Sequence, residues 1–198
     1  PLRLSRSQPK ANVTLERAYA ALQAGKMEDA YHDYEQVLHA DDKNIDALLG
    51  MATLAARQGQ DERAHAYYLS ALEVDPKDAT AQAGLINTRG LSNPARSESL
   101  LKTALDSQPD SAALHFALGN LMASQSRWSD AQQAYFHAYS AESDNPDFIF
   151  NLAISLDHLH QNKLAVQYYQ MAQKAANSSR SVSFDPNQIR KRILELQP

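Results

Sequence analysis

The seven histidines of this chain are the residues whose chemistry would first suggest a metal site. A helical zinc motif needs two histidines at i and i+4 together with a third ligand. The sequence has no HExxH spacing, and Asp157 and His160, which share a helical face at i and i+3, could supply two ligands without completing a site. We therefore expect no metal site and no cofactor.

The patterns that mark common catalytic centres are also missing from the sequence. There is no GxSxG nucleophile pattern and no glycine-rich loop that could cradle a phosphate. Cysteine is absent, which excludes disulfides, thiolate ligands and cysteine nucleophiles. The adjacent carboxylates Asp41 and Asp42 fall at an expected helix end, where solvation explains them. No catalytic residue is predicted, and an enzyme is the least favoured class.

A run of three basic side chains, Arg190, Lys191 and Arg192, occurs near the C-terminus. The chain has 19 Lys and Arg against 23 Asp and Glu, a net charge of −4, whereas nucleic-acid-binding domains usually carry a basic excess. Three charges on the polar face of a terminal helix fit a solvated surface, so we expect no nucleic-acid partner. No run of about 18 apolar residues occurs, so we expect no membrane span.

The elements that position these residues should all be helices. Alanine accounts for 32 of the 198 residues and glycine for only 6. Glycine costs roughly 1 kcal/mol against alanine inside a helix, so this composition favours helix. Small core residues also let helices approach each other closely, and we expect an all-α protein of tightly packed short helices.

Four segments of the chain align with one another and share three positions. Each has an alanine, a tyrosine four residues later and a small or apolar residue three further on, which places all three on one helical face. The alanines are Ala30, Ala64, Ala131 and Ala165. The outer two pairs are 34 residues apart and the middle gap is 67, so a weaker repeat, shortened by one residue, lies between them.

This pattern resembles the tetratricopeptide repeat family, whose unit is a 34-residue helix–turn–helix. Glycines stand in the turn between the helices, at Gly25 and Gly59, and prolines follow the second helix, at Pro76 and Pro109. The third repeat departs most, because Ile86 replaces a small residue. The resemblance implies an all-α, right-handed solenoid of about five repeats with a C-terminal capping helix.

The repeat period divides the chain into expected segments. We expect a disordered linker over 1–10, five repeats over 11–44, 45–78, 79–111, 112–145 and 146–177, and a capping helix over 185–197. First helices are expected over 12–24, 45–58, 79–89, 112–125 and 146–160, and second helices over 27–40, 61–74, 94–107, 128–141 and 163–176.

The last helix should cover the apolar end of the stack. Ile189, Ile193 and Leu196 form one apolar stripe, and we expect them to pack on the fifth repeat while Arg190, Lys191 and Arg192 remain in water. Asp185 suits the N-cap of this helix and Pro186 its first turn.

The resemblance also implies where a partner binds, because first helices line the concave groove in this family. The groove residues it implies are Leu15, Tyr19, Leu49, Thr53, Asn87, Phe116, Asn120, Phe150, Asn151, Ile154 and Asp157. Apolar anchors beside amides suit an extended peptide or a helix, since asparagine both donates and accepts. The alternative is that these residues only solvate the inner face and that Phe116 or Phe150 packs against a neighbouring repeat. Trp128 is expected to pack between the two helices of its own repeat, with ligand stacking as the alternative.

These observations favour a non-catalytic scaffold or adaptor that binds a protein or peptide partner, in the assembly of a larger complex. Two alternatives stay open: a self-association module forming a homo-oligomer, and an assembly factor of the bacterial envelope, as in pilus or secretion systems. The chain begins at Pro1, so we expect a processed or truncated product, and its basic N-terminal stretch is compatible with a soluble fragment of a membrane-anchored envelope protein. The compartment is left open.

Overall fold

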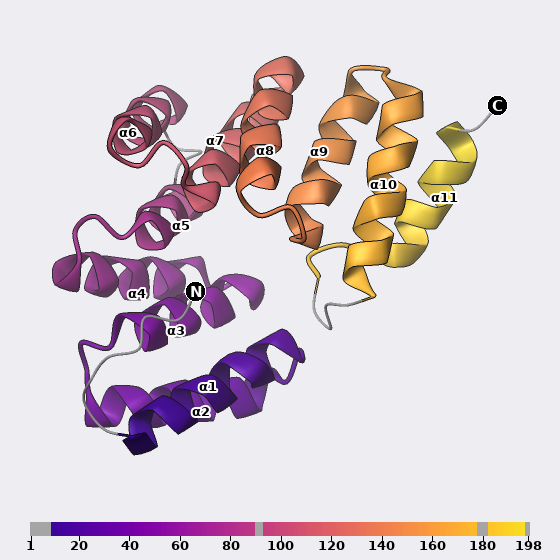
Figure 1. Ribbon diagram of the computed structural model, residues 1–198. Coiled ribbons are helices and arrows are strands. Elements are labelled where there is room, and N and C mark those ends of the chain that lie inside the picture. Colours follow the sequence, from indigo (N-terminus) through magenta and orange to yellow (C-terminus); the bar gives the residue numbers. More distant parts are fainter. Residues whose placement is uncertain (1–8, 90–92, 178–181, 197–198) are drawn as a thin grey trace. The chain divides into compact units, whose positions relative to one another are not determined.

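The computed structural model describes residues 9–89, 93–177 and 182–196, and every regular element in these ranges is an α-helix (Figure 1). The expected all-α class is confirmed. Contacts divide the chain after Arg89 into two compact units. Most of the linker expected over 1–10 lies outside the described residues, and α1 already includes Pro9.

The first unit is a stack of five helices. They are α1 (Pro9–Gln23), α2 (Met27–Ala40), α3 (Ile45–Arg57), α4 (Asp61–Val74) and α5 (Ala79–Arg89). Each helix packs against the next, and α3 also contacts both α1 and α5. The first helices of successive repeats therefore adjoin one another and form one layer of the unit.

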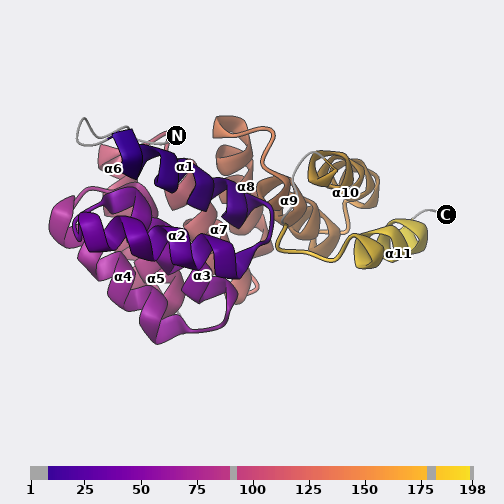
Figure 2. The same ribbon diagram turned by 90° about the horizontal axis from the view of Figure 1, so that it is seen from below.

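The second unit continues the same alternation with six helices. They are α6 (Pro94–Ser107), α7 (Ala112–Ser124), α8 (Trp128–Ala141), α9 (Pro146–His158), α10 (Asn162–Ala176) and α11 (Pro186–Leu196). Neighbours in the sequence are neighbours in space, and α11 packs along α10 in both views (Figures 1 and 2). The ten repeat helices begin and end within three residues of the expected positions.

Side-chain caps fix where the first helices of repeats two to five begin. Asn44 accepts a hydrogen bond from the Ala47 N–H at 3.0 Å, and Asp78 accepts one from Ala81 at 2.8 Å. Ser111 and Asn145 hold the same position in the next two repeats. A side-chain acceptor at the N-cap satisfies a backbone donor that has no partner within the helix, so the cap recurs with the repeat period.

Left-handed backbone marks the turns between paired helices. Gly25 and Gly59 have φ values of 71° and 68°, as expected of turn glycines. Ser126 and His160 occupy the same turn in repeats four and five, with φ values of 59° and 56°. The turn geometry is therefore kept even where the glycine is not.

The repeating alanine and tyrosine form the core between helices. Ala30, Ala64, Ala131 and Ala165 are fully buried, and the tyrosine four residues after each is also buried. A methyl group on Gly50 would lie 2.3 Å from Cζ of the Tyr34 ring, and one on Gly84 would lie 2.2 Å from that of Tyr68. The rings of Tyr34 and Tyr68 thus each need a glycine in the first helix of the following repeat. In repeat three, Gly84 allows this contact although Ile86 occupies the usual small position.

The C-terminal helix packs as its apolar stripe predicted. Ile189 and Ile193 are buried, Leu196 is half-buried, and the Asp185 carboxylate caps the helix by accepting from the Asn187 N–H at 2.9 Å. Arg190, Lys191 and Arg192 are all exposed, as expected, and Arg192 in addition pairs with Asp157 of α9, which the sequence did not predict.

Candidate functional site

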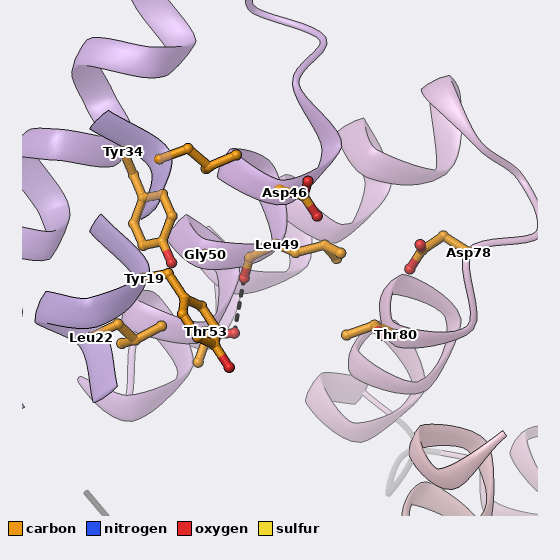
Figure 3. Close-up of a pocket in the computed structure, with 10 residues that line it drawn as sticks. Tyr19, Leu22, Tyr34, Asp46, Leu49, Gly50, Thr53, Asp78 and Thr80 are labelled. Carbon is orange, nitrogen blue, oxygen red and sulfur yellow. Dashed lines mark hydrogen bonds between the residues drawn. The ribbon is translucent and has the colours of Figure 1, made fainter. Parts of the chain in front are cut away.

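A hollow in the first unit lies along its layer of first helices. It has a volume of 590 Å³ and is lined from α1, α2, α3 and the start of α5 (Figure 3). We call it the first-unit groove; its lining residues are Leu15, Tyr19, Leu22, Tyr34, Asp46, Leu49, Gly50, Thr53, Asp78 and Thr80. The groove brings together four residues expected to bind a partner: Leu15, Tyr19, Leu49 and Thr53.

The floor of the first-unit groove is apolar and its rim is polar. Leu15, Leu22 and Tyr34 are buried, whereas the Tyr19 side chain is 45% exposed above them. Figure 3 shows Tyr19 and Tyr34 on one side of the hollow, with Asp78 and Thr80 across from them. An incoming side chain would therefore meet hydrocarbon below and hydroxyl or carboxylate groups at the edge.

Glycine at position 50 makes this floor possible. Because Gly50 has no side chain, the ring of Tyr34 reaches the face of α3 and closes the bottom of the groove. Burial is the main cause that raises the pKa of Tyr34, with the nearby Tyr19 and Asp46 adding to it. Tyrosine is already neutral at physiological pH, and the raised pKa extends that range upward, so the Tyr34 phenol keeps its O–H donor.

The first unit carries a net negative charge, and two of its carboxylates line the first-unit groove. Residues 9–89 contain 8 Lys and Arg and 13 Asp and Glu, a net charge of −5. Asp46 and Asp78 line the groove itself, and Asp78 also caps α5. Thr53 donates its hydroxyl proton to the Leu49 carbonyl at 2.8 Å, so its oxygen keeps only acceptor capacity, and the Tyr68 hydroxyl also contacts it.

In the fourth repeat, the predicted groove residues are engaged within the protein. Phe116 packs against Tyr135 and Phe148, with ring centroids 5.7 Å and 4.8 Å apart. Asn120 accepts a hydrogen bond from the Tyr135 hydroxyl at 2.9 Å. Phe116 thus packs against the next repeat, as the alternative interpretation held.

Asn87 and Asn151 were expected to recognise a partner backbone. Asn151 is half-buried and donates to the Asp147 carbonyl of its own helix at 2.8 Å. Asn87 is exposed on α5, in the first unit, and lies outside the set that lines the first-unit groove.

In the fifth repeat, the predicted residues Phe150, Ile154 and Asp157 lie beside the C-terminal segment. Phe150 stacks on Phe184 with ring centroids 4.4 Å apart. Asp157 accepts two hydrogen bonds from Arg192, both at 2.7 Å, and one from Tyr169 at 3.1 Å. The hydrogen bonds from Arg192 are the main reason that the pKa of Asp157 lies below its ordinary value despite burial.

Histidine and tryptophan make ring contacts in the second unit. Trp128 stacks on His158 at 3.6 Å, nearly parallel, which joins α8 to the next repeat, a contact that the expected packing within its own repeat did not include. Asp157 and His160 line one hollow, but Arg192 already binds both carboxylate oxygens of Asp157. Within residues 9–89, 93–177 and 182–196, no cluster of three or more His, Asp or Glu is placed to hold a metal ion.

Sequence reasoning missed several residues that shape these surfaces. Gly50 and Gly84 follow Tyr34 and Tyr68 by 16 residues, and this repeated spacing was the signal for the ring contacts. Asp46 lies in the first turn of α3 and Asp78 lies just before α5, and nothing in the sequence around either residue marks a groove. Phe184 lies between helices, where no periodic pattern points to its partner.

Comparison with known proteins identifies the repeat in both halves of the chain. The tetratricopeptide repeat profiles match residues 21–86 and 89–139. Cellulose synthase operon protein C of Komagataeibacter sucrofermentans is 33% identical over 70 residues, which is 35% of this chain. The same-named protein of Komagataeibacter xylinus is 34% identical over 70 residues. The chain covers only 5% of the length of these relatives.

Solved structures resemble this one along most of its length. A thermophilic tetratricopeptide repeat protein of Thermus thermophilus has a TM-score of 0.76 at 19% identity, covering 94% of this chain and 98% of that one. PilW, titled a widely conserved type IV pilus biogenesis factor, has a TM-score of 0.66 at 19% identity, covering 96% and 87%. At this identity the likeness establishes the fold.

No described helix is both long enough and apolar enough to cross a bilayer.

Proposed function

Because this chain belongs to the tetratricopeptide repeat family, whose repeats form protein-interaction scaffolds, we propose that it is non-catalytic and holds an extended peptide of a protein partner in the first-unit groove. The observation that carries the proposal is the groove itself: an open hollow of 590 Å³ with a leucine and tyrosine floor. Concave, mostly apolar sites with a few polar groups are the usual form of a binding pocket.

The lining of the groove defines the chemistry of the peptide. Leu22 and Leu49 would bury an aliphatic or aromatic side chain, and the exposed ring of Tyr19 would cover it from the side. Asp46 and Asp78 favour a neighbouring lysine or arginine, in keeping with the net charge of −5 over residues 9–89. We therefore expect a short peptide with one large apolar anchor next to a basic residue.

A peptide library displayed on phage tests this proposal. Selected peptides are synthesised and their affinities measured by calorimetry against wild type and Leu49→Arg, which places a bulky cation in the groove. We expect at least tenfold weaker binding, because aromatic and aliphatic anchors commonly carry a large share of the binding energy. Leu69→Arg is the matched control, since Leu69 is 44% exposed on α4 outside the groove; binding within twofold of wild type is expected.

Two results would contradict the proposal. One is a set of selected peptides that bind Leu49→Arg as tightly as wild type. The other is selection of acidic peptides, since the charge of the first unit disfavours them. The first result requires a correctly folded Leu49→Arg variant, shown by an unchanged helical circular dichroism spectrum.

We also propose that the partner belongs to a bacterial envelope assembly. The support is the name of PilW, a pilus biogenesis factor of similar fold, and the names of the partial relatives from a cellulose synthase operon. Photo-crosslinking from position 19 in bacterial cells, followed by mass spectrometry, tests it. Crosslinks to envelope proteins are expected with the reactive group at 19 and are expected to be lost when it is moved to 69.

Self-association is the remaining alternative for the first-unit groove. Size-exclusion chromatography with light scattering, over a hundredfold range of concentration, separates it from partner binding. We expect a monomer at every concentration. A dimer in wild type that becomes a monomer in Leu49→Arg would instead assign the groove to a second copy of this chain.

A further inference from the structure

A segment of the chain itself lies across the fifth repeat. Residues Ser183, Phe184 and Arg192 lie against a row of four side chains on α9, three of which were expected to bind a partner. We call this row the fifth-repeat face; it consists of Asp147, Phe150, Ile154 and Asp157. These positions are spaced at i, i+3, i+7 and i+10, so they lie along one side of the helix.

Three different contacts hold the segment on this face. Ser183 donates to Asp147 Oδ1 from both its backbone N–H, at 2.9 Å, and its hydroxyl, at 2.7 Å. Phe184 stacks on Phe150 at 4.4 Å with the rings tilted by 31°. Arg192 donates to the two carboxylate oxygens of Asp157, each at 2.7 Å, in a bidentate pair.

These contacts differ from those that attach the rest of α11. Ile189 and Ile193 are buried apolar side chains, which is the chemistry of a structural cap. Ser183, Phe184 and Arg192 combine a main-chain donor, an aromatic anchor and a bidentate arginine, which is how short peptides are usually recognised. A hollow of 500 Å³ also remains between the segment and α9, lined in part by Ile154 and Gln188.

We propose that the fifth-repeat face is a peptide-binding site, separate from the first-unit groove, that the chain's own Ser183–Arg192 segment occupies. The partner it fits carries a serine or threonine followed by an aromatic residue, with an arginine eight residues after the aromatic one. That partner segment displaces the internal segment and takes its three contacts.

The tether sets how strongly the internal segment competes. A segment that belongs to the same chain as its site competes at an effective concentration far above that of a dilute external peptide. An external peptide with the same contacts therefore binds weakly while the internal segment is in place. Loosening the internal segment raises the fraction of open sites and strengthens binding in the same proportion.

The probe is a fluorescent synthetic peptide of residues 182–196, and binding is followed by fluorescence anisotropy. The full chain is compared with its Phe184→Ala/Arg192→Ala double variant, which weakens the internal segment and keeps the fifth-repeat face intact. We expect the double variant to bind the peptide at least tenfold more tightly than wild type. Adding Phe150→Ala to the double variant is expected to abolish that gain.

Arg192→Glu provides a milder second variant, because it removes one contact and repels Asp157. It is expected to bind the peptide at least threefold more tightly than wild type. The matched control is Lys191→Glu, which makes the same change at the adjacent, exposed residue and should leave peptide affinity unchanged. Leu49→Arg should also leave it unchanged, so a failure here is distinguishable from a failure of the first-unit groove.

Three results would overturn the proposal. The first is equal peptide affinity in wild type and both folded variants. The second is tighter binding that survives Phe150→Ala, which would place the peptide elsewhere. The third is loss of the folded state in both the double variant and Arg192→Glu, seen by circular dichroism, which would make the segment a fixed part of the fold.

Discussion

Arg192 and Asp157 form a bidentate ion pair across 35 residues of sequence, with both nitrogen–oxygen distances at 2.7 Å. The carboxylate is nearly buried and also accepts a hydrogen bond from Tyr169, so its removal from water is compensated on both oxygens. The guanidinium side chain is 45% exposed. The pair therefore joins α11 to α9 at the edge of the second unit.

Replacing Arg192 with alanine should destabilise the second unit by about 1–2 kcal/mol, since hydrogen bonds to charged groups are worth more than neutral ones while the exposure of Arg192 reduces the value. Thermal unfolding followed by circular dichroism measures the loss. Lys191→Ala, at the neighbouring exposed position, is the control and should melt within error of wild type.

The contribution of this pair should also depend on pH. Because the pKa of Asp157 is lower in the folded chain than the ordinary value of about 3.9, the pair stabilises the fold fully above that pH and the effect is lost as pH falls through the lower folded pKa. The difference in free energy of unfolding between wild type and Arg192→Ala should thus be constant from pH 7 to 5 and shrink toward pH 3. Urea titrations at these pH values test it, and a difference that grows on acidification would contradict the assignment.

Gly50→Ala should destabilise the first unit, because the added methyl group would lie 2.3 Å from Cζ of the Tyr34 ring. Overpacking a filled core costs about 1–3 kcal/mol. The cost should fall when Tyr34 is already leucine, since the ring that causes the clash is then absent. A double-mutant cycle by urea unfolding measures this coupling, and additive losses would show that the methyl group is accommodated some other way.

Most of the helical architecture follows from local patterns. Each helix carries its own sequence signals, such as a buried alanine or a capping residue, and these signals recur every 34 residues. The helices that contain Ala30 and Ala64 could therefore be predicted correctly from the sequence. The close approach of Gly50 to Tyr34 was also readable, because the spacing recurs at Gly84 and Tyr68.

The surfaces were harder to predict, because their partners break the repeat period. Asp157 was expected to face a ligand, but its partner Arg192 lies in a helix outside the five repeats. Phe184 covers Phe150 from a stretch without helical periodicity. Trp128 contacts His158 of the following repeat, a contact that depends on how the helices stack and that no spacing within one repeat encodes.

Ser126→Gly should stabilise the chain. Ser126 has a φ of 59°, and a left-handed conformation costs a residue with a side chain roughly 1–2 kcal/mol relative to glycine. Glycine loses more backbone entropy on folding, so the net gain should be about 0.5–1 kcal/mol. Thermal unfolding measures it against Ser99→Gly, made at an exposed residue inside α6, which should be destabilising instead. Equal effects at the two sites would argue against strain in the turn.

His115 should make the fold less stable in mild acid. Its ring stacks on His137 at 4.8 Å, and burial is the main cause that lowers its pKa below the ordinary value of about 6.5, with the charge of His137 adding to it. The unfolded chain then binds a proton more readily than the folded chain, so stability should fall as pH drops below about 6.5 toward the folded pKa.

His115→Phe keeps a ring beside His137 and cannot be protonated. The free energy of unfolding in urea, measured between pH 7.5 and 5.0, should therefore decline less steeply in His115→Phe than in wild type, even though the variant loses the 2.7 Å hydrogen bond to the Pro109 carbonyl at every pH. Parallel declines in the two proteins would assign the acid sensitivity to other groups.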